Sequence, residues 1–176
     1  MDITRAFEVA FNRKKEKNWE KIYVIVDIHD TILKACYENE EVYDYYPYAR
    51  EALQLMTTRE DICLILWSGC YEEKMNEYRN RFAEEGIRFD YSNENPEVGN
   101  TSFQNFEAKL YFNVGIDDKF GFEPETDWIK VIEALLWGIS DQDVYCFLYY
   151  YSFPPNSLYD TFSGFHLSFG VGLSAG

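Results

Sequence analysis

The sequence predicts an α/β fold built on a doubly wound parallel sheet, because apolar strand-like runs alternate along the chain with helix-like segments. The runs KIYVIVDI (21–28) and ICLILWSG (62–69) are continuous stretches of mostly aliphatic residues, which is typical of strands buried on both faces. Both end in polar residues, and parallel sheets bind ligands outside the carboxyl ends of their strands. We therefore expect a functional site at that end of the sheet.

The remaining elements follow from apolar spacing and from residues that start or stop helices. Apolar residues recur at helical spacing in YPYAREALQLMTTRED (46–61), where Pro47 lies near the start. The segment SGCYEEKMNEYRNRFAEEG (68–86) predicts a polar-faced helix that ends at Gly86. We also expect two shorter strands and a closing helix, in IRFDY (87–91), KLYFNVGIDD (109–118) and DWIKVIEALL (127–136).

The chain of 176 residues is long enough for one well-buried domain followed by a tail. Ile3, Phe7 and Ala10 recur at helical spacing, so residues 1–20 predict an amphipathic helix packed on the core. Residues 21–136 then form the α/β domain.

The tail, residues 137–176, differs in composition from the rest of the chain. It contains no Lys or Arg and is crowded with aromatic residues, and its last part alternates apolar and small residues, as in a hairpin. Three explanations stay open: the tail docks on the core, it contacts a second copy in a homo-oligomer, or it results from an altered reading frame.

The formal net charge is −15, so the surface repels phosphate backbones and long nucleic acid is a poor candidate ligand. A small phosphorylated ligand is compatible with this charge, since a divalent cation inverts the local field inside a cleft. The four cysteines form no CxxC pair, which favours free thiols in a reducing compartment, so we expect a cytoplasmic location. No run approaches the roughly 20 apolar residues that span a bilayer.

Chemically useful side chains follow the predicted strands. Asp27 closes the first strand, Ser68 closes the second, and Asp117 and Asp118 close the fourth, with Lys109 just before it. A carboxylate can attack phosphorus, paired acids can hold Mg²⁺, and lysine and hydroxyl groups can neutralise phosphate oxygens. The set predicts phosphoryl transfer, and no nucleotide-binding loop or hydrolase motif elsewhere in the chain competes with it.

In its first motif the sequence resembles the haloacid dehalogenase (HAD) superfamily. That family has an apolar strand followed by Asp-x-Asp-x-Thr, and the corresponding residues in VIVDIHDTIL are Asp27, His29 and Thr31. The later motifs of the family, a strand ending in Ser or Thr, a lysine and an acidic pair, also appear in order. They correspond to Ser68 in ICLILWSG and to Lys109, Asp117 and Asp118 in KLYFNVGIDDKFGF.

The resemblance extends from about residue 21 to residue 136 and implies a HAD-like Rossmannoid three-layer sandwich. It also implies a phosphatase-type hydrolase that is Mg²⁺-dependent and cleaves a phosphomonoester through an aspartyl phosphate. The implied nucleophile is Asp27, and the implied metal ligands are Asp27, the backbone carbonyl of His29, Asp117 and Asp118. The implied phosphate-binding residues are Thr31, Ser68, Gly69 and Lys109, of which Lys109 also counts as catalytic.

His29 departs from the family pattern, in which an aspartate two residues after the nucleophile protonates the leaving group and then activates water. Histidine has a reference pKa of about 6.5 and can donate and accept protons within one cycle. Three hypotheses follow. His29 is the acid/base, or Asp30 or a water takes that role, or hydrolysis is impaired and the protein is a non-hydrolytic phosphate-binding or interaction module.

The segments 32–61 and 90–109 are too short for a cap domain, so the resemblance implies a capless member, whose substrates are often large. Tyrosines of YENEEVYDYYPY (37–48) would lie on a loop beside the crevice, where they pack on the rim or stack on a base or sugar. For the function of the protein, a nucleotide or nucleic-acid end phosphatase is therefore a third hypothesis, beside the phosphomonoester hydrolase and the non-hydrolytic binding module. Turn formation accounts for Asn93 and Asn95 without a ligand. The five tyrosines are Tyr37, Tyr43, Tyr45, Tyr46 and Tyr48.

Overall fold

The computed structural model describes residues 2–38 and 41–136 of the chain. The tail predicted for residues 137–176 lies outside the described residues. Within the described part, none of the helices has the length and apolar character needed to cross a membrane.

A four-stranded parallel sheet forms the centre of the structure, and its strand order is β5-β4-β1-β6. β1 (Ile22–Asp27) lies between β4 (Ile62–Trp67) and β6 (Val114–Ile116), and β5 (Tyr91–Ser92) pairs with the far side of β4. The runs predicted as buried strands supply β1 and β4, whose side chains are almost all buried. The predicted α/β architecture with a parallel sheet is thus confirmed.

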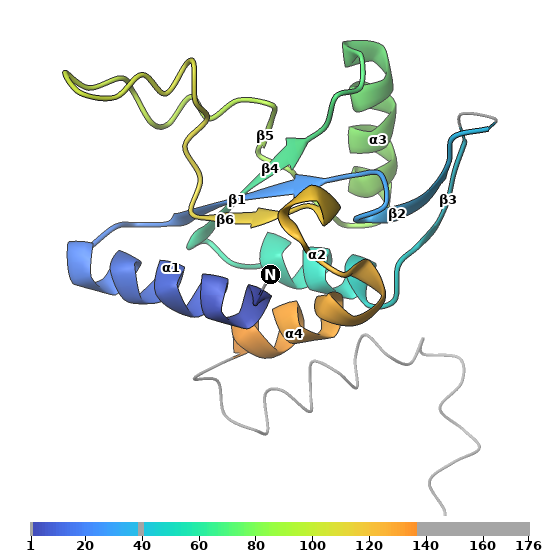
Figure 1. Cartoon of the computed structure of the whole chain (residues 1–176), viewed down its shortest axis with the longest axis horizontal. Helices are drawn as coiled ribbons and strands as arrows, with labels where there is room; N and C mark the ends of the chain where they lie inside the picture. Colours follow the sequence, from blue (N-terminus) through green and yellow to red (C-terminus); the bar gives the residue numbers. More distant parts are fainter. Residues whose placement is uncertain (1, 39–40, 137–176) are drawn as a thin grey trace, which may run out of the picture. The chain divides into compact units, whose positions relative to one another are not determined.

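Helices cover both faces of this sheet (Figure 1). α1 (Ile3–Lys17), α2 (Ala49–Thr57) and α4 (Pro124–Leu136) lie on one side, and α3 (Glu72–Glu84) lies on the other. α4 packs against both α1 and α2, because its apolar side chains are buried along most of its length. These three helices thus cover one face of the sheet that carries the strand ends.

The helix α1 begins and ends at clear sequence signals. The carboxylate of Asp2 accepts a hydrogen bond from the backbone N–H of Arg5 at 3.1 Å, which caps the first turn. Asn18 ends the helix in a left-handed conformation with φ 54°. Ile3 and Phe7 are fully buried, as their helical spacing predicted.

The third strand is shorter than the predicted segment IRFDY (87–91), since β5 contains only Tyr91 and Ser92. The reason lies in the side chain of Asp90. Its carboxylate accepts the backbone N–H of Leu64 at 2.9 Å, while its own N–H donates to the Leu64 carbonyl at 2.8 Å. A side chain therefore takes the place that a strand backbone would occupy beside β4.

The predicted tyrosine-rich loop contains a hairpin that sequence reasoning missed. β2 (Leu33–Cys36) and β3 (Glu41–Tyr45) pair antiparallel, and we call them the flap hairpin. Asp30, at φ 54°, directs the chain into it, and its carboxylate accepts the backbone N–H of Ala35 at 3.3 Å. The flap hairpin and α3 rise on the same side of the sheet (Figure 1).

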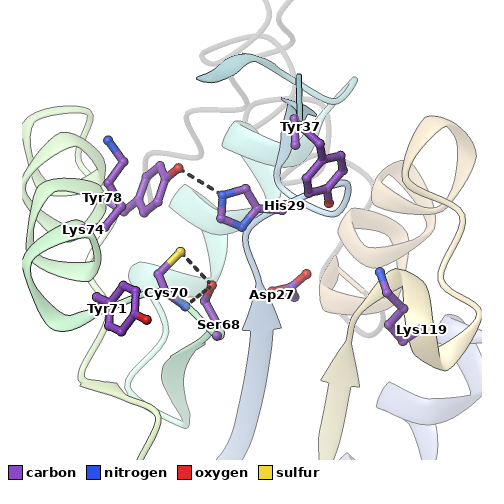
Figure 2. Close-up of a pocket in the computed structure, with 11 residues that line it drawn as sticks. Asp27, His29, Tyr37, Ser68, Cys70, Tyr71, Lys74, Tyr78 and Lys119 are labelled. Atoms are coloured by element: carbon purple, nitrogen blue, oxygen red, sulfur yellow. Dashed lines mark hydrogen bonds between the residues drawn. The ribbon is translucent and has the colours of Figure 1, made fainter. Parts of the chain in front are cut away.

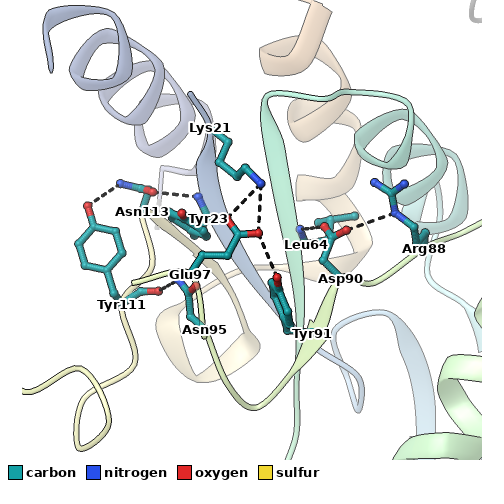
Figure 3. A network of polar contacts seen from close by, with 10 residues as sticks. All are labelled: Lys21, Tyr23, Leu64, Arg88, Asp90, Tyr91, Asn95, Glu97, Tyr111 and Asn113. Carbon is teal, nitrogen blue, oxygen red and sulfur yellow. Dashed lines mark hydrogen bonds and ion pairs between the residues drawn. The ribbon is translucent and has the colours of Figure 1, made fainter. Parts of the chain in front are cut away.

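Residues 93–113 form a long irregular segment, which extends beyond the predicted loop because β6 contains only Val114–Ile116 of the strand segment predicted in 109–118. One carboxylate fastens this segment to the sheet (Figure 3). Glu97 accepts hydrogen bonds from the hydroxyls of Tyr23 and Tyr91, each at 3.1 Å, and pairs with the Lys21 ammonium at 3.0 Å. Burial alone would raise the pKa of Glu97, but the hydrogen bonds from Lys21, Tyr91 and Tyr23 outweigh it and lower the pKa. We call these four side chains the Glu97 network.

Replacing Glu97 with Gln should lower the free energy of unfolding by about 1 kcal/mol at pH 7, because three donors lose a charged acceptor at a partly exposed site. Urea unfolding followed by circular dichroism measures the change. Glu94→Gln, on the same loop, is the matched control and should change the value by less than about 0.5 kcal/mol. Equal losses in both variants would show that the Glu97 network does not fasten the loop.

Candidate active site

Three carboxylates meet at the carboxyl end of the sheet. Asp27 ends β1, and Asp117 and Asp118 follow the last residue of β6. One oxygen of each carboxylate lies within 4.8 Å of the others. The pairing of β1 with β6, in which Val26 lies opposite Ile116, brings the acids together as the sequence predicted.

Burial and mutual repulsion disfavour the charged forms of the carboxylates in this cluster. Burial raises the pKa of Asp27 to about 6, and the neighbouring Asp117 and Asp118 add to the shift. Burial also raises the pKa of Asp117. Lys119 donates to both carboxylate oxygens of Asp118, at 2.7 and 2.6 Å, which neutralises one charge of the three. Half-buried oxygen ligands with excess negative charge suit a hard divalent cation such as Mg²⁺, so the residues present fit that ion.

Buried hydrogen bonds hold the acids in place. Thr31 is fully buried, and its hydroxyl accepts the backbone N–H of Asp118 at 3.2 Å. The Thr31 carbonyl in turn accepts the indole N–H of Trp128 in α4 at 2.9 Å. The carboxylate of Asp117 accepts the backbone N–H of Lys119 at 2.8 Å. The structure therefore places Thr31, predicted to bind phosphate, beneath the acids, with its hydroxyl engaged by Asp118.

Ser68 follows β4 and is fixed by Asn93. The Asn93 side chain accepts the Ser68 backbone N–H at 2.9 Å and donates to the Ser68 carbonyl at 2.7 Å. Asn93 itself has φ 55°, a left-handed conformation that asparagine tolerates better than most residues. Sequence reasoning considered a turn, or amide hydrogen bonds to a substrate, for Asn93 and missed that it positions Ser68.

A cavity of about 660 Å³ opens above these strand ends (Figure 2). Four of the predicted site residues lie on its wall: Asp27, His29, Ser68 and Gly69. The cavity is flanked by α3 on one side and by the flap hairpin on the other, because Tyr78 and Tyr37 also line it. These four predicted residues thus face one common space, whereas Asp117 and Asp118 lie beside Asp27 without being part of the cavity wall.

His29 is held by a tyrosine of α3. Its Nε2 atom lies 3.1 Å from the hydroxyl of Tyr78, and the two rings meet edge to face with centroids 5.5 Å apart. Burial lowers the pKa of His29, Asp30 raises it and Lys74 lowers it further. Figure 2 shows the second ring nitrogen on the side of the ring that faces Ser68 and Asp27.

Asp30 has a different task from the acid/base role considered for it. One carboxylate oxygen accepts the Tyr37 hydroxyl at 2.8 Å, and the other accepts the Ala35 backbone N–H at 3.3 Å. Both oxygens therefore bind the flap hairpin, and Asp30 is not among the residues that line the cavity in the described part of the chain.

The lysines of the cavity are not the predicted one. Lys74 and Lys119 line it, whereas Lys109 is exposed on the irregular segment, where its N–H donates to the Asn105 carbonyl at 3.1 Å. Two signals in the sequence point to these positions. Lys119 directly follows the acidic pair, and Lys74 lies one helical turn before Tyr78 on the helix that follows Ser68.

Comparison with known proteins supports the fold and adds no activity. Neither a protein-family model nor a curated protein sequence matches the chain. A conserved protein from Bacteroides thetaiotaomicron has a similar solved structure, with a TM-score of 0.53 and 28% sequence identity. The likeness covers 71% of this chain and 98% of that one.

Asp27→Asn should raise the free energy of unfolding by about 1–2 kcal/mol at pH 7.5 without divalent ions, because one of three repelling charges disappears from a half-buried site. A carboxyl group with a raised folded-state pKa favours folding at low pH, and this contribution is lost as the pH rises through about 6. The difference between variant and wild type should therefore shrink toward pH 4. Urea unfolding in EDTA measures it.

Asp44→Asn, at an exposed acid of the flap hairpin, is the charge-matched control and should change stability by less than about 0.5 kcal/mol. Adding Mg²⁺ should stabilise the wild type and not Asp27→Asn, because only binding to the folded state adds stability. A clear destabilisation by Asp27→Asn in EDTA would contradict the repulsion described above.

Proposed function

We propose that the protein is a Mg²⁺-dependent phosphomonoester hydrolase of the HAD type that works through an aspartyl phosphate on Asp27. The observation that carries this proposal is the approach of three carboxylate oxygens within 4.8 Å at the strand ends, beside a cavity that Ser68 also lines. A nucleophilic carboxylate, a place for a hard cation and a phosphate-binding hydroxyl are the parts that this reaction needs.

In the first step, an oxygen of Asp27 attacks phosphorus, and the bond from phosphorus to the leaving-group oxygen breaks. Ser68 and the neighbouring Gly69 would orient the phosphate oxygens at the end of β4. Asp27, Asp117 and Asp118 would hold the Mg²⁺ ion, which would supply neutralisation of the phosphoryl charge. In the second step, water attacks phosphorus, the bond to Asp27 breaks, and inorganic phosphate leaves.

His29 is suited to move the proton in both steps. If its Nε2–H donates to the Tyr78 hydroxyl throughout, the Nδ1 atom on the cavity side is free to lose and regain a proton. Nδ1 would protonate the leaving-group oxygen first and take a proton from the attacking water afterwards. Tyr78 would then act as a positioning residue that keeps the ring in this orientation.

A non-hydrolytic phosphate-binding protein is the second candidate, and His29 at a position usually held by aspartate favours it. Burial lowers the pKa of His29, so the imidazole is neutral in most molecules at pH 7. Few molecules then carry the proton that a leaving group needs. Turnover distinguishes the two candidates.

Phosphate release from an aryl phosphate should depend on Mg²⁺ in the wild type and should fall at least about 10³-fold in Asp27→Asn, because the nucleophile is lost. The rate should also fall at acid pH, on the acid side of the ordinary histidine range because burial lowers the pKa of His29, since the protonated ring can no longer accept a proton from water. His29→Asp should move that fall to lower pH.

Release of phosphate is measured from pH 5 to 8 with and without Mg²⁺, and circular dichroism verifies that each variant is folded. An inactive wild type that gains activity as His29→Asp would overturn the enzymatic proposal. In that case the protein is a phosphate-binding module on an enzyme-like fold.

Lys119→Met should lower kcat/KM about 10- to 100-fold, whereas Lys109→Met should leave it within about twofold. Of these two lysines, Lys119 lines the cavity and Lys109 does not. The two substitutions remove the same charge from two exposed lysines, so Lys109→Met is the matched control. The reverse result would restore the role that the motif resemblance implies for Lys109.

A further inference from the structure

The outer wall of the active-site cavity is rich in aromatic rings that come from different elements. Tyr37 comes from the turn of the flap hairpin, Tyr71 precedes the first residue of α3, and Tyr78 lies within α3. Figure 2 places Tyr37 on one side of the catalytic groups and Tyr71 with Tyr78 on the other. Segments far apart in the sequence thus supply rings to one rim.

The cavity is larger than a phosphate group requires. Its volume of about 660 Å³ lies within the range of roughly 300–1,000 Å³ that is typical of pockets for whole small-molecule ligands. Asp27, Ser68 and Gly69 line the part of the cavity at the strand ends, where the phosphate would bind. The remaining space between the rings is available to the group that carries the phosphate.

Two of these rings are exposed and have no packing role that explains them. Tyr71 is 91% exposed and Tyr37 is 69% exposed, although both line the cavity. Tyr71 also occupies the N-cap position of α3 without making a side-chain cap hydrogen bond. A Ser, Thr, Asp or Asn at that position would stabilise the helix, so stability of α3 does not account for tyrosine there.

The flap ring is fixed in place without a ligand. The Tyr37 hydroxyl donates to Asp30 at 2.8 Å, and Asp30 is itself bound to the backbone of Ala35. A ring that is already ordered loses little conformational freedom when a ligand stacks on it. The Lys74 ammonium lies 5.5 Å from the centroid of the Tyr78 ring, which is the range of a cation–π contact, and it adds positive charge to the same wall.

We propose that this rim is a leaving-group subsite for small phosphomonoesters that carry a planar aromatic or heteroaromatic ring, with Tyr37 and Tyr71 as its stacking residues. The proposal rests on the proposed function, because the phosphate defines where the ring is placed. Stacking on aromatic side chains tolerates many ring types, so the subsite accepts a ring that is joined to the ester oxygen directly or through a sugar.

Binding without turnover tests the subsite. In Mg²⁺, the full-length protein should bind phenylphosphonate about tenfold more tightly than methylphosphonate in calorimetry, and cyclohexylphosphonate should lie closer to methylphosphonate because its ring is not planar. Tyr71→Ala and Tyr37→Leu should each reduce the phenyl preference to about threefold or less. Tyr71→Phe should retain it, and Tyr48→Ala, at an exposed tyrosine that does not line the cavity, should leave it unchanged.

Equal affinity for the phenyl and methyl compounds, or an unchanged preference in both Tyr71→Ala and Tyr37→Leu, would overturn the subsite. Turnover of tyrosine phosphate, adenosine 5′-monophosphate and glycerol phosphate then distinguishes the two sources of the ring. Ring-selective binding without any turnover would remove the proposed hydrolase and leave the subsite. Turnover without ring preference would support the proposed hydrolase and remove the subsite.

Discussion

The parallel register of β1 between β4 and β6 is the constraint on which the rest of the structure depends. Val26 lies opposite Leu66 on one side and Ile116 on the other, so the three strands end at the same level. The residues that follow, Asp27 and Asp117 among them, must therefore emerge together. A slip of one residue would move them apart by about 3.3 Å and turn the side chains to the other face.

This register assembles charges that repel one another, so the rest of the domain has to hold them. The core supplies the stabilisation through the almost complete burial of β1 and β4 and of the apolar face of α4. Thr31 and Trp128 then connect the acidic turn to α4 by two hydrogen bonds, one partly buried and one fully buried. Burial, together with repulsion from Asp117 and Asp118, raises the pKa of Asp27, and the same repulsion favours a cation once the site is formed.

The sequence predicted the parts of the site that depend on strand ends, and it missed the parts that depend on tertiary packing. Asp27 and Asp117 could be located because a continuous apolar run fixes where a buried strand stops. Lys109 was predicted from the order of the motifs alone. The order of residues along a chain does not say which lysine side chain reaches the cavity. Lys119 does so because the 3₁₀ turn after β6 carries it there. Nor could spacing reveal the clamp of Asn93 on Ser68, which joins two segments 25 residues apart.

The histidine between two acids now has a physical explanation. An aspartate at position 29 would place a fourth carboxylate beside a cluster in which Asp27 already has a raised pKa. A neutral imidazole adds no negative charge, and Tyr78 gives its Nε2 atom a hydrogen-bond partner that a shorter carboxylate would reach differently. The reduced pKa of His29 then favours proton acceptance over proton donation. A leaving group that departs easily as an anion needs little protonation, and aryl esters, whose leaving oxygen is stabilised by the ring, meet that need. The chemistry of His29 and the aromatic rim of the cavity thus favour the same class of ligand.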